Sequence, residues 1–178
     1  MKKENIKYHS NIPSKYFNKK KQIKNNSFIS KRLKKISEDI NDKKDIYHVL
    51  SKNFKLNFKK KELIKYKKYK QVVIIGMGGS ILGIKAIYSF LGKKIKKKII
   101  FIDNLDENLI KKNVEKQSLK KTLFIIISKS GNTLETLANI NLIKIDNFHS
   151  SNSIIITEEK TNSLNKFAKK KGIPTIEH

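Results

Sequence analysis

The 178-residue sequence contains no cysteine, which excludes disulfide bonds and thiolate metal sites. Its four histidines are scattered along the chain, and no two of them have the spacing of metal ligands. We therefore predict no metal site, and we predict no cofactor.

Long apolar runs are missing as well. The longest span about five residues, whereas a membrane helix needs roughly 20. The first ten residues are polar and lack the apolar segment of a signal peptide. These features predict a cytoplasmic protein that does not enter a membrane.

Arginine is almost absent from a strongly basic chain. Of the 41 basic residues only Arg32 is an arginine, and the formal net charge is +26. Proteins that read nucleic acids rely on the bidentate guanidinium group. Lysine, isoleucine and asparagine, whose codons are rich in A and T, dominate the composition, so a biased genome explains the charge. Nucleic acid is therefore not expected as a partner, and non-specific binding to a polyanion is the alternative.

The positive charge is concentrated in residues 1–70, which carry 23 basic and 6 acidic side chains. Residues 1–27 show no apolar period and are predicted to form a loosely packed arm. Over 28–40 apolar residues recur at helical spacing, and two weaker helical patterns cover 46–50 and 60–68. We interpret residues 1–70 as a basic, mostly helical N-terminal extension.

The pattern changes at Val72, where short apolar runs begin to alternate with helical stretches. Alternation of this kind is typical of βαβ units and a parallel sheet. The predicted strands are 71–75, 98–102, 122–127, 153–156 and 174–176, and the predicted helices between them are 79–91, 107–117, 133–145 and 162–171. Residues 71–178 are thus predicted to form an α/β domain of three layers, α-β-α, around a parallel five-stranded sheet.

The sequence Gly-Met-Gly-Gly-Ser at 76–80, here called the glycine turn, follows the first predicted strand. Gly78 and Gly79 permit a tight bend, and Ser80 can cap the next helix and donate to an anion. Free backbone N–H groups at a helix start, together with the helix dipole, favour a phosphate group there. A dinucleotide site and a turn without a ligand are alternatives, although Gly83 has the wrong spacing for a dinucleotide fingerprint.

The sequence Ser-Lys-Ser-Gly-Asn-Thr at 128–133, here called the serine turn, follows the third predicted strand. Its hydroxyl groups can donate to phosphate oxygens without a full charge. It lacks the Gly-Lys-Ser/Thr sequence of loops that bind nucleoside triphosphates. Because right-handed crossovers place both turns at the carboxyl edge of one sheet, we predict that they converge on one phosphorylated ligand.

Three carboxylates lie close in sequence to helix starts at this edge. Glu135 falls in the first turn of a predicted helix, where it interacts favourably with the helix dipole. Asp103 and Asp106 flank another helix start, and we expect both to act as caps. Asp103 also lies where a dinucleotide-binding protein would hold ribose. None of the three is assigned as a catalytic residue.

Two segments carry a resemblance to a known family. They are Val-Val-Ile-Ile-Gly-Met-Gly-Gly-Ser-Ile-Leu-Gly at 72–83 and Ser-Lys-Ser-Gly-Asn-Thr-Leu-Glu-Thr at 128–136. Together they resemble the two phosphosugar-binding signatures of glucose-6-phosphate isomerases. The order of the segments and the βα unit between them match the first sugar-isomerase (SIS) domain of that family. The resemblance covers residues 71–178, and the extension before it corresponds only loosely to the family's variable N-terminal helices.

The resemblance implies a sugar-phosphate site. The phosphate would be bound from one side by Gly79 and Ser80 and from the other by Ser128, Lys129, Ser130 and Thr133, with Gly131 and Asn132 shaping the loop. The implied substrates are glucose 6-phosphate and fructose 6-phosphate, which the family interconverts as aldose and ketose in glycolysis and gluconeogenesis.

The catalytic glutamate, histidine and lysine of that family belong to a second SIS domain and a C-terminal segment, which have no counterpart within residues 1–178. We therefore expect the chain to be the N-terminal, phosphate-binding part of such an enzyme and to be inactive alone. The family commonly forms homodimers. A phosphosugar-sensing regulator that binds DNA through residues 1–70 is an alternative of another class, although no clear helix-turn-helix pattern supports it. Other SIS-domain isomerases are a further alternative.

Overall fold

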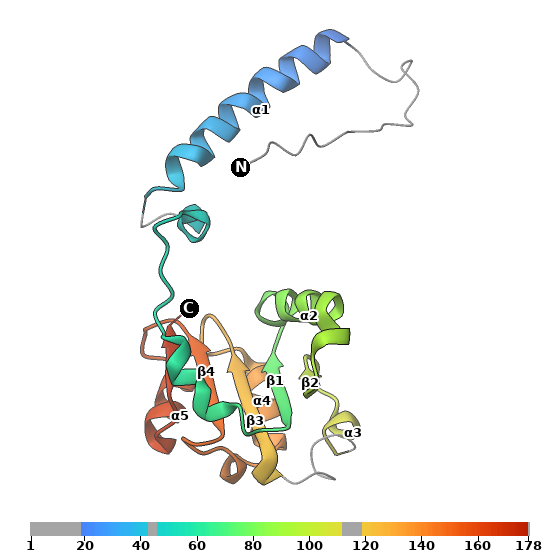
Figure 1. Ribbon diagram of the computed structural model, residues 1–178, viewed down its shortest axis with the longest axis vertical. Coiled ribbons are helices and arrows are strands. Elements are labelled where there is room, and N and C mark those ends of the chain that lie inside the picture. The colour runs from blue at the N-terminus through green and yellow to red at the C-terminus, as the bar shows by residue number, and fades with distance from the viewer. Residues whose placement is uncertain (1–18, 43–45, 112–118, 178) are drawn as a thin grey trace. The chain divides into compact units, whose positions relative to one another are not determined.

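The computed structural model describes residues 19–42, 46–111 and 119–177. The chain divides into two compact units, Met1–Lys55 and Leu56–His178. The first contains the longest helix, and the second contains the whole sheet (Figure 1). The sheet therefore has a core of its own.

The first unit contains α1 (Lys19–Asp39) and the short 3-10 helix η2 (Ile46–Leu50). Helix α1 begins nine residues earlier than the apolar period indicates, so the predicted arm is wrong for residues 19–27. This stretch has no proline or glycine, and its lysines and glutamine favour a helix without producing an apolar period. Residues 1–18 of the predicted arm lie outside the described residues.

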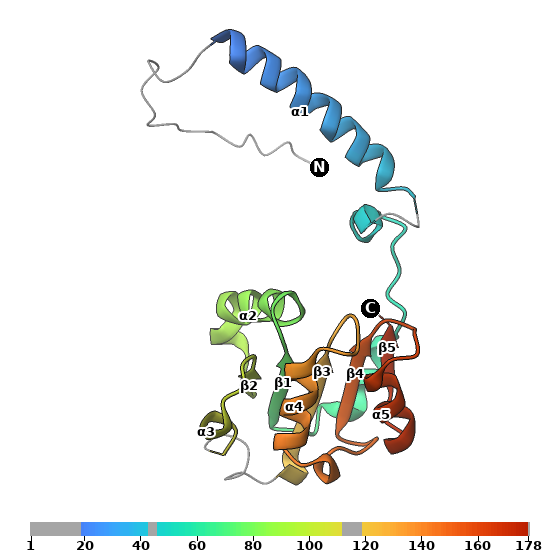
Figure 2. The same cartoon turned by 180° about the vertical axis from the view of Figure 1, so that it is seen from behind.

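Five strands form one parallel sheet in the second unit (Figures 1 and 2). They are β1 (Gln71–Gly76), β2 (Lys98–Ile102), β3 (Thr122–Ile127), β4 (Ser153–Thr157) and β5 (Thr175–Glu177). Their order is β2-β1-β3-β4-β5, and every neighbouring pair is parallel. The five predicted strands are confirmed, with each end within one residue of its predicted position.

The predicted α-β-α layering is also confirmed. Helices α3 (Glu107–Ile110), α4 (Leu134–Leu142) and α5 (Ser163–Lys171) contribute to the core on one face of the sheet (Figure 2). Helix α2 (Gly79–Leu91) and the 3-10 helix η3 (Lys60–Tyr66) contribute to the core on the other face. Because both faces are covered, the central strands are almost wholly apolar and buried.

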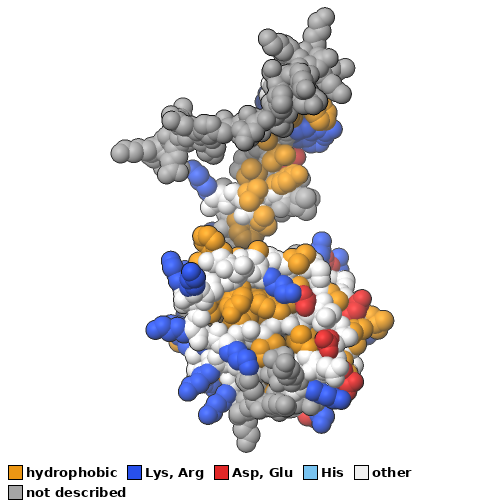
Figure 3. All heavy atoms as spheres, turned by 90° about the vertical axis from the view of Figure 1, so that its right-hand side faces the viewer, with side chains coloured by type: hydrophobic (Ala, Val, Ile, Leu, Met, Phe, Trp, Pro, Cys, Tyr) orange, Lys and Arg blue, Asp and Glu red, His pale blue; other side chains and the backbone are white. Residues whose placement is uncertain are grey.

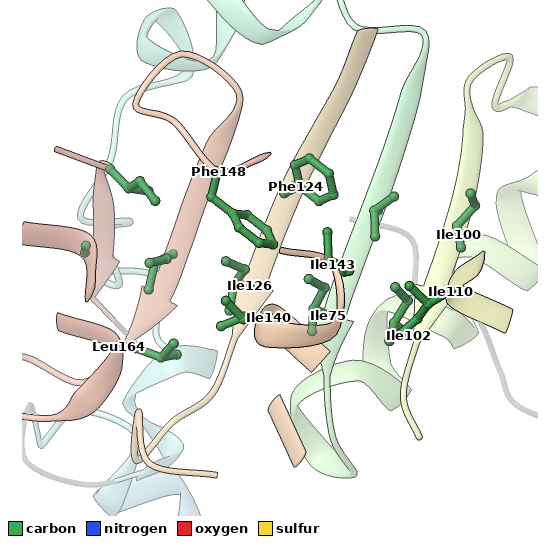
Figure 4. Close-up of a cluster of buried hydrophobic side chains, with 14 residues drawn as sticks. Ile75, Ile100, Ile102, Ile110, Phe124, Ile126, Ile140, Ile143, Phe148 and Leu164 are labelled. Atoms are coloured by element: carbon green, nitrogen blue, oxygen red, sulfur yellow. The ribbon is translucent and has the colours of Figure 1, made fainter. Parts of the chain in front are cut away.

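Aromatic residues fill the core beneath α4 and α5. The rings of Phe124 on β3 and Phe148 before β4 are both fully buried, with centroids 4.8 Å apart (Figure 4). Phe167 of α5 packs on Phe148 at a centroid distance of 6.0 Å. This cluster packs β3 and the segment before β4 against α5.

Helix α2 has its predicted bounds, whereas α4 ends early. Helix α3 covers Glu107–Ile110, and most of the remainder of its predicted range lies outside the described residues. Helix α4 ends at Leu142 because Lys144 adopts a left-handed backbone conformation with φ 69°. The chain then turns through η7 (Ile145–Asn147), which brings Phe148 into the core.

The segment before β1 covers part of the second face. Tyr69 is 5% exposed, and its hydroxyl donates to the Ser151 carbonyl at 2.7 Å. Replacing Tyr69 by phenylalanine leaves that carbonyl without this donor, so the free energy of unfolding should fall by about 1 kcal/mol. Urea denaturation followed by circular dichroism measures the change. An unchanged stability would show that this contact does not hold the segment in place.

The surface of the second unit carries separated charges. On the face drawn in Figure 3, basic side chains lie around the rim and also within the face, acidic side chains lie mainly on the right, and apolar and uncharged groups separate them. Within the described ranges, no helix is long and apolar enough to cross a membrane.

Candidate functional site

The glycine turn and the serine turn begin side by side at the carboxyl edge of the sheet. Gly76 at the end of β1 pairs with Ile127 at the end of the neighbouring strand β3. Because β2 lies on the other side of β1, the strand order reverses between β1 and β3. Ligands of open α/β sheets bind at such a switch point. The structure therefore brings the two predicted phosphate-binding turns to the edge position that favours a ligand.

The glycine turn leads directly from β1 into α2. Gly78 has φ 52° and ψ −125° and is the N-cap of α2, and its carbonyl accepts from the N–H groups of Ile81 and Leu82, each at 3.1 Å. The predicted capping role of Ser80 is wrong, because α2 starts at Gly79 and Ser80 lies inside the helix. Gly79 is exposed at a helix start, where N–H groups have no intrahelical acceptor.

The serine turn is held by its own hydroxyl groups. The Ser128 hydroxyl lies 2.9 Å from the Thr133 hydroxyl, which closes the turn. Ser128 Oγ also accepts from the Gly131 N–H at 3.2 Å, and Ser130 Oγ accepts from the Asn132 N–H at 3.2 Å. Thr133 is the N-cap residue of α4. The turn therefore has a defined shape at the start of α4.

Exposure separates the predicted ligands of the serine turn into two kinds. Lys129 and Ser130 are exposed and can meet a ligand from solvent. Ser128 is only 1% exposed, so its hydroxyl is part of the frame of the turn. Asn132, which was expected to shape the loop, accepts from the Ser163 N–H through Oδ1 at 2.9 Å. The turn thus presents Lys129 and Ser130 on a frame of internal hydrogen bonds.

Two of the three carboxylates at this edge are engaged in the structure. Asp106 caps α3 as predicted and accepts from the Leu109 N–H at 2.9 Å. The predicted capping role of Asp103 is wrong, because its carboxylate forms an ion pair with Lys85 of α2. Glu135 lies half-buried in the first turn of α4, as predicted.

The β4–α5 connection contributes contacts that sequence reasoning missed. The Lys129 carbonyl accepts from the Glu158 N–H at 3.0 Å and from the Thr157 hydroxyl at 3.3 Å. The Gly131 carbonyl accepts from the Leu164 N–H at 3.0 Å. In the sequence, the residues that support the serine turn form only a polar run before α5, which resembles an ordinary helix start. The connection therefore supports the serine turn from the side opposite β1.

A cavity of about 660 Å³ lies elsewhere on the sheet edge, beside α5 and β5. Its lining combines acidic and basic side chains, among them Glu158, Lys160 and Lys166, and it includes none of the eight predicted site residues. In the part of the chain that the structure describes, no three histidine or carboxylate side chains are grouped so that they could hold a metal ion. The switch point therefore remains the candidate site.

A family model described as phosphoglucose isomerase matches residues 16–167 of the chain. The chain belongs to this family. The matched region contains β1 to β4 and both turns, and it also contains α1 of the basic extension. The resemblance inferred from the two turns is therefore confirmed.

Individual members of the phosphoglucose isomerase family show the same relationship. The chain is 38% identical over 118 residues to a glucose-6-phosphate isomerase from Borrelia garinii subsp. bavariensis, covering 63% of this chain and 20% of that protein. It is 49% identical over 85 residues to one from Methanocaldococcus jannaschii, covering 46% of this chain and 21% of that protein. The chain thus spans about a fifth of the length of these curated relatives.

A solved structure of this family supports the fold. The crystal structure of a glucose-6-phosphate isomerase from Chlamydia trachomatis matches with a TM-score of 0.56 at 27% identity. The match covers 65% of this chain and 23% of that protein. The α/β fold predicted from the sequence is therefore also the fold of a solved relative.

Proposed function

We propose that this chain provides the sugar-phosphate-binding part of a glucose-6-phosphate isomerase, which interconverts glucose 6-phosphate and fructose 6-phosphate. The observation that carries the proposal is the position of the glycine and serine turns at one switch point in a chain of this family. The proposal includes the cytoplasmic location predicted from the sequence and the homodimer that the family resemblance implies, and sedimentation of the purified chain tests the second of these.

The phosphate would lie between the starts of α2 and α4. Helix starts present N–H groups without intrahelical acceptors, together with the positive end of the helix dipole. Gly79 and Ser80 would bind from one side, and the exposed Lys129 and Ser130 from the other.

The paired hydroxyls of the serine turn can add one more donor. Because the Ser128 and Thr133 hydroxyls are bonded to each other at 2.9 Å, only one of the two protons is used between them. The other proton can be donated to a phosphate oxygen. Gly131 and Asn132 would shape the turn.

We also propose that the chain alone binds its ligand without isomerising it. Transfer of a proton between C1 and C2 needs a carboxylate base at that edge of the sugar. Asp103 is paired with Lys85, Asp106 caps α3, and Glu135 lies in the first turn of α4. A coupled assay with fructose 6-phosphate should show no turnover, and turnover by the purified chain would contradict this part of the proposal.

The basic extension favours the isomerase over a DNA-binding regulator. The family match begins at residue 16 and therefore includes α1 and its lysines. An appended DNA-binding region would lie outside an isomerase model. The lysines of α1 therefore lie within the isomerase family match, and their charge needs no separate DNA-binding region to explain it.

Titration of the full chain with fructose 6-phosphate tests the binding site directly. Amide signals of residues 79–80 and 128–133 should shift and saturate in NMR spectra, whereas fructose without the phosphate should cause no saturable shift. The Ser130→Ala variant loses one hydroxyl donor, so its dissociation constant should rise about fivefold. The matched control is Ser89→Ala, an exposed serine on α2 outside both turns, which should bind as the parent does.

The strong positive charge requires a control for non-specific anion binding. Inorganic sulfate at equal ionic strength should shift the same amides less and should not saturate in the same concentration range. Shifts that spread over lysine-bearing surfaces and are equal for sulfate and fructose 6-phosphate would contradict the proposed function.

A further inference from the structure

We propose that Asn162 is a positioning residue of the phosphate site, which holds the serine turn so that its N–H groups and not its carbonyls face the ligand. This inference rests on the proposed function and adds a residue outside both turns. Asn162 lies in the β4–α5 connection and is 3% exposed. It does not reach the ligand itself, so its effect is exerted through the backbone of the turn.

The first step is the direction of two carbonyls. The carbonyls of Lys129 and Gly131 both accept hydrogen bonds from the β4–α5 connection. In the sheet order, β4 lies on the side of β3 opposite to β1. The two carbonyls are therefore turned away from the glycine turn and from the place proposed for the phosphate. A carbonyl oxygen pointing at an anion would repel it, so this orientation favours binding.

The second step is the contact of Asn162 with the donors of these bonds. Its side-chain amide donates from Nδ2 to the Thr157 hydroxyl at 3.3 Å and to the Glu158 carbonyl at 3.4 Å. Thr157 and Glu158 are the two residues whose hydroxyl and N–H bond the Lys129 carbonyl. Asn162 therefore holds Thr157 and Glu158, and these two residues in turn hold the Lys129 carbonyl.

The third step is the N-cap of α5. Asn162 Oδ1 accepts from the Asn165 N–H at 2.8 Å, which starts the helix. Between these two residues, the Ser163 N–H donates to Asn132 Oδ1 at 2.9 Å, and the Leu164 N–H donates to the Gly131 carbonyl at 3.0 Å. The start of α5 thus donates to the serine turn, and the cap residue sets the direction of these donors.

The fourth step is direct packing. A Cβ atom at Gly131 would lie 2.2 Å from both Cγ and Oδ1 of Asn162. The side-chain amide of Asn162 therefore occupies the space beside the Cα atom of Gly131. The amide therefore limits movement of the Gly131 backbone toward Asn162.

The variant Asn162→Ser separates positioning from folding. Serine is as good an N-cap as asparagine, so the start of α5 should be kept. The serine side chain is too short to fill the space beside Gly131 and has no amide to bond Thr157 and Glu158. Measured by the same NMR titration well below the unfolding transition, the dissociation constant for fructose 6-phosphate should rise about five- to tenfold.

The matched control is Asn165→Ala in the first turn of α5. The Asn165 amide donates to the carbonyls of Glu158 and Lys160 and, among the described residues, forms no hydrogen bond with the serine turn. This variant should bind fructose 6-phosphate with the parent's dissociation constant even if its melting temperature falls. Its behaviour therefore shows whether lost stability of the connection alone changes affinity.

The outcomes separate the inference from the proposed function. Weaker binding in Asn162→Ser with parental binding in Asn165→Ala supports the positioning role. Parental binding in Asn162→Ser, while Ser130→Ala binds weakly, overturns the inference and leaves the proposed function standing. Equal weakening in both asparagine variants overturns the inference in favour of a general structural role. No saturable response in the parent chain overturns the proposed function, and the inference with it.

Discussion

Replacing Gly131 by alanine should abolish saturable sugar-phosphate binding and lower the free energy of unfolding by about 2–4 kcal/mol. Gly131 has φ 66°, a conformation that costs an alanine about 1–2 kcal/mol. The added Cβ atom would also meet Asn162 at 2.2 Å, so the β4–α5 connection must move. Urea denaturation measures the stability, and the NMR titration with fructose 6-phosphate measures the binding.

Gly83→Ala is the matched control for this substitution. Gly83 lies inside α2, and an added Cβ atom there would have no neighbour within 4 Å. Alanine favours a helix over glycine by about 0.5–1 kcal/mol, so this variant should be slightly more stable than the parent. A Gly131→Ala chain as stable as the parent would contradict the geometry described for the serine turn.

The double variant Gly131→Ala/Asn162→Ala separates the two causes of the loss. Removing the Asn162 amide relieves the close contact but leaves the unfavourable φ angle. The double variant should therefore be less destabilised than the sum of the two single variants by about 1 kcal/mol or more. If the two losses of unfolding free energy add exactly, the added Cβ atom at position 131 does not clash with Asn162.

Truncating Phe124 to alanine should lower the free energy of unfolding by about 3–5 kcal/mol. Its ring is fully buried on the central strand β3 and packs on Phe148 at a centroid distance of 4.8 Å. The neighbours cannot close the resulting cavity without moving α4 and α5 toward the sheet. Urea denaturation with a two-state fit gives the difference, and a loss below about 1.5 kcal/mol would mean that the core collapses readily.

Phe90→Ala is the control for the aromatic truncation. Phe90 on α2 is 89% exposed, so removing its ring deletes little buried surface. Its effect on the free energy of unfolding should stay within about 0.5 kcal/mol. Both variants make the same chemical change, so the difference between their free energies of unfolding measures the effect of burying the ring.

The strands and both turns could be predicted because their signals are local. Strands β1 and β3 are mainly apolar runs that are almost wholly buried, and each turn follows such a run directly. The position of the turns at one edge follows from the right-handed crossover rule, which holds for almost every parallel βαβ unit. These parts of the site need no knowledge of distant contacts.

The parts that sequence reasoning missed depend on partners far along the chain. Asp103 has the sequence position of a cap, but Lys85, 18 residues earlier, pairs with its carboxylate. Asn162 has the sequence position of an N-cap and is the N-cap of α5. It also packs beside Gly131, from which α4 and β4 separate it along the chain. Helix α4 ends before its apolar period does, because Phe148 is drawn into the core. In each case a tertiary contact selects among conformations that the local sequence allows.

The support of the serine turn by the β4–α5 connection sets the order in which the site can form during synthesis. Once residue 134 has left the ribosome, the nascent chain contains every predicted phosphate ligand. The carbonyls of Lys129 and Gly131 gain their donors only when Glu158 and Leu164 have followed. The ligand-binding geometry is therefore completed only after residue 164 has been made, by residues that do not touch the ligand.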